Sequence, residues 1–192
     1  MFGWGKKERD RKKQKVTESR NQAYGIPPIK VDSARVTETV REDLRNNIKS
    51  LREVSAEDFN MVYDAAIRSI SAGRALDIIY QALMNIEGMS TRRAEDIALS
   101  LNNKADALIA IEARERLGIK YAVWRYSGAT CGNAEQDAAH KAADGMIYLI
   151  KKGILMNGRW TWPGREDGCK CVSKPLILGI HYTGDKPEGY FE

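Results

Sequence analysis

The spacing of apolar residues changes at Gly118, and this change restricts the fold classes open to the chain. Over residues 91–117 apolar side chains recur at intervals of three and four, which is typical of an amphipathic helix. Ser90 precedes this segment as an N-cap, and Gly118 follows it where helices often end in the left-handed conformation. Residues 120–126 are aromatic and β-branched at period two, which predicts a strand. We therefore expect an α+β protein: a helical N-terminal half whose long helix leads into a small antiparallel, hairpin-rich C-terminal subdomain.

The same periodicities, together with capping and turn residues, predict the other elements. Helices are expected over 31–52, from Ala56 to Gly73, and over 74–87, and a short helix is expected over 134–143. Strands are expected over 146–150 and 171–178. Asn157-Gly158 separates two apolar stretches and predicts a hairpin, because both residues tolerate positive φ. The expected divisions are a basic arm with a proline linker (1–30), a helical region (31–88), a C-terminal domain (89–180) and a tail (181–192).

The net charge of +5 is concentrated near the N-terminus. Residues 6–15 contain seven basic and two acidic side chains, so the remaining chain is balanced. One interpretation is a solvated arm that aids solubility. The other is an electrostatic tether to DNA or to an acidic protein, because clustered cations release counterions from phosphates. The basic side chains are Lys6, Lys7, Arg9, Arg11, Lys12, Lys13 and Lys15.

The chain shows no membrane or secretion signal. No run approaches eighteen consecutive apolar residues, and the first four residues lead into charged residues instead of an apolar signal region. We expect a soluble cytosolic product with no membrane partner.

Three cysteines and one histidine form the candidate metal ligands. Cys131, Cys169 and Cys171 cannot all pair within one chain, and in a cytosolic protein we expect them to be reduced. With His140 they offer three thiolates and an imidazole, a ligand set that suits one structural zinc ion. On a regular strand Cys169 and Cys171 would point to opposite faces, so only a bend at Lys170 would bring their sulfurs together. The alternative is that the cysteines are small apolar side chains in a crowded turn.

No motif indicates an active site. The glycine-rich nucleotide motifs and the zinc-protease motif are absent, and a cysteine nucleophile assisted by His140 lacks a recognisable third residue. We expect no enzymatic activity and no small-molecule substrate, and we interpret Glu166-Asp167 as loop solvation.

The aromatic residues near the C-terminus are predicted to fill the core of the small sheet. Trp160 and Trp162 would share one face of their strand, which suits a core. The predicted core residues are Trp124, Trp160, Trp162 and Pro163. The alternative is that exposed indoles beside arginines stack on nucleic-acid bases.

An ordered series of uncommon motifs extends approximately over residues 88–178. The run RAEDIALSLNNKADALIAIEARERLGIKYAVW (93–124) is followed by His140, by Asp144-Gly145, by Lys152-Gly153, by GRWTWPG (158–164) and by CKCVSKP (169–175). This series resembles the head-morphogenesis domain of phage minor head proteins related to protein F of phage Mu. Two positions depart from the family pattern: Lys170 stands where arginine is usual, and residues 137–139 replace the usual lead into the histidine.

The resemblance implies a structural virion protein without enzymatic activity. Such a protein is made in the infected bacterium, acts in head assembly at the portal or the inner capsid wall, and contacts DNA during packaging or ejection. Its partners would be the portal protein and other capsid proteins, and its location the phage head. His140, Cys169 and Cys171 correspond to polar positions that recur in the family. The alternative function is a cytosolic, zinc-stabilised nucleic-acid-binding protein.

Overall fold

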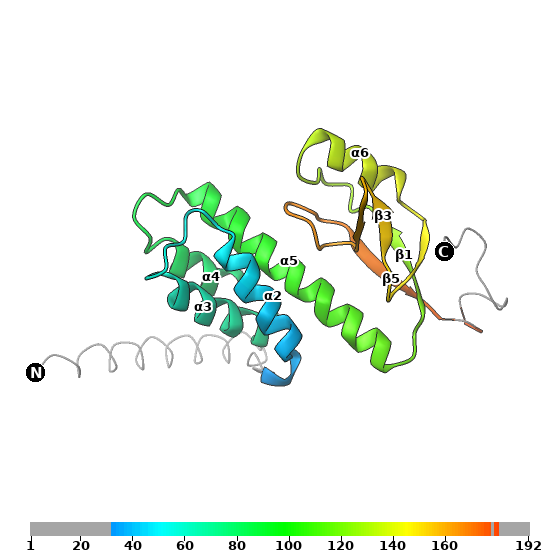
Figure 1. The fold of residues 1–192 in the computed structure, drawn as a ribbon, viewed down its shortest axis with the longest axis horizontal. Helices are drawn as coiled ribbons and strands as arrows, with labels where there is room; N and C mark the ends of the chain where they lie inside the picture. The colour runs from blue at the N-terminus through cyan, green and yellow to red at the C-terminus, as the bar shows by residue number, and fades with distance from the viewer. Residues whose placement is uncertain (1–31, 178, 181–192) are drawn as a thin grey trace, which may run out of the picture. The chain divides into compact units, whose positions relative to one another are not determined.

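A computed structural model describes residues 32–177 and 179–180, which belong to one compact unit (Figure 1). The predicted basic arm (1–30) and the tail (181–192) lie outside the described residues. A helical first half with a long helix is followed by small antiparallel sheets, which confirms the predicted α+β class.

The long helix shares the core of the preceding helices, so the helical region is taken from here on as residues 32–117 and no longer as the predicted 31–88. It is built on one apolar core. Its elements are the 3-10 helix η1 (Ser33–Arg35) and the helices α2 (Glu38–Lys49), α3 (Phe59–Ser71), α4 (Leu76–Leu83) and α5 (Thr91–Arg116). The apolar stripes of the α-helices meet in a cluster that includes the fully buried Leu44, Ile70 and Leu83. Burial of these stripes stabilises the helices, because packing contributes more to helix stability in proteins than propensity does.

The first predicted helix is shorter than expected. The prediction places one helix over 31–52, whereas the structure has η1 and then α2. Thr37 is the N-cap of α2, and its Oγ1 accepts a hydrogen bond from the N–H of Val40 at 3.3 Å. This bond satisfies one of the first free N–H groups of the helix and sets its start at Glu38.

The predicted start of the second helix is wrong by three residues. Ser55 Oγ accepts from the N–H of Asp58 at 3.1 Å and donates to the Asp58 carboxylate at 2.6 Å. Ser55 and Asp58 have the spacing of a capping box, which predicts the start at Ala56, but the pair closes a turn, and α3 begins only at Phe59. Hydroxyl-to-backbone bonds of this kind occur in isolated turns as well as at helix starts.

We call residues 118–180 the C-terminal module. Its elements are β1 (Tyr121–Arg125), α6 (Ala134–Ala142), β2 (Ile147–Leu149), β3 (Ile154–Met156), β4 (Arg159–Thr161) and β5 (Val172–Leu176). Strands β2, β1 and β5 form an antiparallel sheet in that order, and β3 and β4 form a separate hairpin. Asn157 and Gly158 have φ of 47° and 76°, so they turn this hairpin as predicted.

The module has its own core, distinct from that of the helices. Its buried members include Trp124, Tyr148 and Ile150 together with all three cysteines. Figure 1 shows α5 extending from the other helices toward β5, and Ile111 of this helix packs against the second core. Helix α5 thus contributes to both cores.

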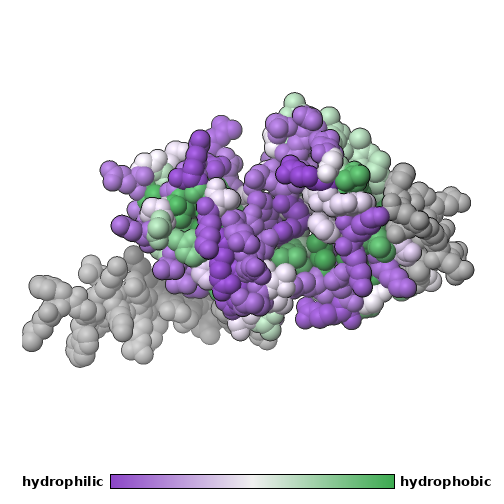
Figure 2. Space-filling view, in the orientation of Figure 1, coloured by the Kyte–Doolittle hydropathy of each residue, from purple (hydrophilic) through white to green (hydrophobic). Residues whose placement is uncertain are grey.

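Hydrophilic residues cover most of the face shown in Figure 2, where apolar residues form small separate patches. None of the helices in the described part of the chain combines the length and the hydropathy needed to cross a membrane.

Candidate metal centre

The three cysteines and His140 converge at one point inside the C-terminal module. Cys131 lies in the loop between β1 and α6, His140 lies in the last turn of α6, and Cys169 and Cys171 lie just before β5. In chain order, the four residues are 0, 1, 1 and 4% exposed. Their ligand atoms all lie within 4.8 Å of one another, so the cluster could hold a metal ion.

The distances between these atoms show a cluster of free thiols. Cys131 Sγ lies 3.7 Å from Cys171 Sγ, far beyond the roughly 2.0 Å of a disulfide. His140 Nδ1 lies 3.6 Å from Cys169 Sγ and 3.7 Å from Cys171 Sγ. Residues 169–171 precede β5 and are not part of a strand, so strand alternation does not separate the two sulfurs.

Backbone N–H groups point at two of the sulfurs. The N–H of Lys170 donates to Cys131 Sγ, and the N–H of Gly164 donates to Cys169 Sγ, both at 3.2 Å. Hydrogen bonds of this kind favour the thiolate over the thiol. The backbone around the cysteines is therefore arranged to accept negative charge on sulfur.

The thiols affect one another's ionisation. Hydrogen bonds from Cys171 and from the Gly164 N–H lower the pKa of Cys169 to about 6. The neighbouring Cys169 and burial raise the pKa of Cys171, and burial raises the pKa of Cys131. One thiolate forms readily, but two more anions in the same buried space require a compensating cation.

His140 is oriented by groups on two sides. Its Nε2 lies 3.1 Å from Glu166 Oε2, while its Nδ1 faces the sulfurs. The Trp124 ring lies edge-on to the imidazole, with centroids 5.1 Å apart. A carboxylate behind the far nitrogen is the usual support of a metal-binding histidine, because it fixes the tautomer and the ring orientation.

The two cysteine-bearing loops pack directly on each other through glycines. The N–H of Gly132 donates to the carbonyl of Gly168 at 3.3 Å. A Cβ on Gly168 would lie 3.0 Å from the Gly132 backbone, and φ at Gly168 is +69°. Only glycine combines this approach with this backbone conformation.

Asp137 anchors the loop that carries Cys131. Its carboxylate binds the Lys141 ammonium and accepts hydrogen bonds from the Cys131 N–H at 2.9 Å and the Tyr126 hydroxyl at 2.7 Å. These three donors, with Lys141 contributing most, lower the pKa of Asp137 to about 2.

We call residues 163–171 the cysteine loop. This loop also binds the helical region. The Arg165 guanidinium makes a two-pronged contact with the Asp43 carboxylate of α2 and donates to the Lys104 carbonyl of α5 at 2.9 Å. Asn103 Nδ2 donates to the Cys169 carbonyl at 3.1 Å. The loop that supplies two candidate ligands is thus fastened to both α2 and α5.

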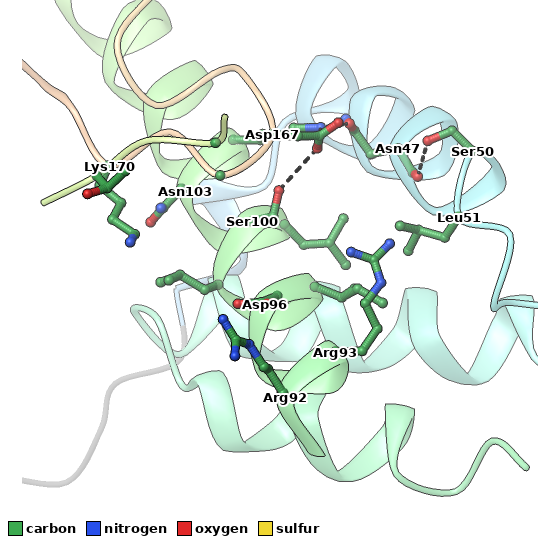
Figure 3. A pocket seen from close by; sticks show the side chains of 17 residues that line it. Asn47, Ser50, Leu51, Arg92, Arg93, Asp96, Ser100, Asn103, Asp167 and Lys170 are labelled. Carbon is green, nitrogen blue, oxygen red and sulfur yellow. Dashed lines mark hydrogen bonds and ion pairs between the residues drawn. The ribbon is translucent and has the colours of Figure 1, made fainter. Parts of the chain in front are cut away.

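A polar cleft of about 590 Å³ lies beside the cluster, between α2, α5 and the two cysteine-bearing loops (Figure 3). None of the four candidate ligands lines it. Two of its cations are paired: Arg93 binds Glu53, and Lys104 lies 2.6 Å from Asp167. The candidate ligands are therefore not part of this cleft, although Cys171 lines a second cavity of about 410 Å³.

Of the four predicted core residues, the structure buries two, half-buries one and exposes one. Trp124 and Pro163 are buried, and Trp162 is half-buried. Trp160 is 44% exposed, so its assignment to the core is wrong. Strand β4 ends before Trp162, and Trp160 pairs with the 55% exposed Leu155 on the outer face of a two-stranded hairpin.

The residues that support the cluster were not predicted from the sequence. Glu166 binds His140 and is only 25% exposed, so interpreting it as loop solvation is wrong. Asp167 binds Lys104 but stays 90% exposed, as that interpretation expects. The available signal was an acidic residue three positions before Cys169. The amide donors at Gly164 and Lys170 carry no signal in the sequence.

Comparisons with protein-family models, with curated proteins and with solved structures found no match to this chain.

Proposed function

We propose that this chain is a phage minor head protein whose C-terminal module is held closed by one structural zinc ion. The observation that carries the zinc part of this proposal is the buried cluster of three thiols and one imidazole, none of them more than 4% exposed. A catalytic zinc keeps one coordination position open, whereas four protein ligands make a closed structural site.

The spacing of the ligand atoms supports zinc. Zinc binds thiolate sulfur at about 2.3 Å and imidazole nitrogen at about 2.0–2.1 Å in a tetrahedron. These bond lengths give sulfur–sulfur edges of about 3.8 Å and sulfur–nitrogen edges of about 3.6 Å. Three of the six separations match these values: 3.7 Å between Cys131 and Cys171, and 3.6 and 3.7 Å from His140 to Cys169 and Cys171. The other three are no longer than 4.8 Å.

When bound, zinc supplies the positive charge that balances three adjacent thiolates. The amide donors at Gly164 and Lys170 would then support zinc-bound thiolates, and Glu166 would hold His140 in the metal-binding tautomer.

The roles of the motif residues support an assembly protein over an enzyme. Asn103 joins α5 to the Cys169 carbonyl, and Trp162 Nε1 donates to the carbonyl of Ile150 at 2.7 Å. Trp124 packs against His140. These residues carry the resemblance to minor head proteins, and in each case they fasten two segments of the fold together.

The proposal places the protein in the phage head, in contact with the portal and other capsid proteins. The helical region would offer the interaction surface, the module would give rigidity, and the basic arm would contact DNA or the portal.

Purified phage heads test the location of the protein. We expect the tagged chain to co-sediment with gradient-purified heads that contain portal and major capsid protein. Its absence from such heads would refute the minor head function.

Native mass spectrometry tests the metal. We expect one zinc per chain from metal-replete cells, lost in Cys131→Ser and kept in Ala138→Ser, a matched change on the exposed surface of α6. An apo mass for the unaltered protein would refute the zinc site and leave the head assignment to be decided by co-sedimentation.

A further inference from the structure

Charge is unevenly distributed between the two halves of the folded chain. Residues 32–117 contain 12 basic and 15 acidic side chains, a net charge of −3, whereas residues 118–180 contain nine basic and five acidic side chains, a net charge of +4. The positive charge is therefore not confined to the N-terminal arm, because the module is itself basic.

Much of this charge surrounds the β3–β4 hairpin. Residues 145–165 contain no carboxylate, and Lys151, Lys152 and Arg159 lie just before or within the hairpin. Lys120 lies next to them, since its carbonyl accepts the N–H of Ile150 at 2.8 Å. Within the described part of the chain, none of these four cations has a carboxylate partner.

An exposed indole lies on the same hairpin. Trp160 and its cross-strand partner Leu155 are 44% and 55% exposed on the outer face of the hairpin. The Lys152 ammonium lies 4.6 Å from the centroid of the Trp160 ring. A cation and an accessible aromatic ring are thus presented together.

We infer that this surface binds single-stranded nucleic acid, with the phosphates on Lys151, Lys152 and Arg159 and a base stacked on Trp160. One nucleotide contains both a phosphate and a planar base, so a strand matches a surface that offers a cation and an indole side by side. An acidic protein segment would satisfy the cations but has no repeating planar group for the ring. The inference does not rest on the minor head function, because charge and exposure alone carry it.

The test measures binding of the full-length, zinc-loaded chain to a short fluorescent oligo(dT) over a range of salt concentrations. The triple variant Lys151→Gln, Lys152→Gln, Arg159→Gln should make the slope of log K against log salt shallower by about 2, because each phosphate contact on a single strand contributes about 0.7. Trp160→Ala should weaken binding on the order of tenfold with the slope unchanged, and Trp160→Phe should keep most of the affinity.

A matched triple variant controls for net charge. Arg92→Gln, Arg116→Gln and Lys174→Gln remove three exposed cations elsewhere, and we expect affinity within about twofold of the unaltered chain. The basic arm is present in every variant, so differences between variants do not come from the arm. Zinc content and far-ultraviolet circular dichroism should be equal throughout, because the altered side chains are exposed.

Three results would overturn the inference. Equal losses in the two triple variants would mean that only net charge matters, and unchanged affinity in Trp160→Ala would remove the stacking contact. Equal or tighter binding of poly-glutamate through the same residues would identify an acidic protein as the partner.

Discussion

Removal of the metal is expected to unfold the C-terminal module while the helical region stays folded. The two cores are separate, and the module contains only a few large buried apolar side chains, chiefly Trp124, Tyr148 and Ile150. In a module of roughly 60 residues apolar burial and chain entropy nearly cancel, so the core alone leaves a net stability near zero, whereas a structural zinc site contributes on the order of 10 kcal/mol. Without the ion, the free energy of unfolding of the module should therefore fall to about zero or below, and the module should be largely unfolded.

Two spectroscopic signals separate the module from the helices. Three of the four tryptophans, Trp124, Trp160 and Trp162, lie in the module, so tryptophan emission reports its folding. Helix α6 contributes nine residues, against 12, 13, 8 and 26 in α2 to α5. A zinc chelator under reducing conditions should shift the emission to the red and reduce ellipticity at 222 nm only slightly, and added zinc should reverse both changes.

Either of two results would refute this reasoning. If ellipticity at 222 nm collapses together with the emission shift, the two cores unfold as one cooperative unit. If the emission stays unchanged after the metal has been removed, the apolar contacts of the module are sufficient without it.

Three further predictions concern the supporting contacts. Glu166→Gln should weaken zinc affinity about 10- to 100-fold in competition with a chromophoric chelator, because it weakens the support of the metal-binding histidine; unchanged affinity would contradict that role. A double-mutant cycle on Asp43→Ala and Arg165→Ala, measured by urea unfolding of the zinc-loaded chain, should give a coupling of about 1–3 kcal/mol, because the pair is bidentate and only 18% and 21% exposed; a coupling near zero would show that the cysteine loop docks without it. A hydrogen bond from Arg93 lowers the pKa of Glu53 from 4.5 to about 2, so this carboxylate stabilises the helical region fully above pH 4.5, and its contribution is lost as pH falls toward 2. Glu53→Gln should flatten this part of the acid-unfolding curve followed at 222 nm, and a curve of unchanged shape would contradict the assigned ion pair.

The sequence by itself determined the elements that depend on local interactions. The apolar spacing over 91–117, with Ser90 before it and Gly118 after it, predicts α5 (Thr91–Arg116) to within one residue. Asn157-Gly158 likewise fixes the hairpin turn. Periodicity, capping and positive φ depend on residues a few positions apart, so each can be recognised without knowing the rest of the fold.

Only the tertiary structure decided which distant residues meet. Cys131 and His140 reach Cys169 and Cys171 across 29 to 40 positions, and the close packing of two loops at Gly168 brings them together. The role of Glu166 likewise depends on a distant segment, because the position of α6 brings His140 to it. The exposure of Trp160 depends on which face of the hairpin points outward. Burial and ligand geometry are properties of packing between segments, and for that reason no local pattern encodes them.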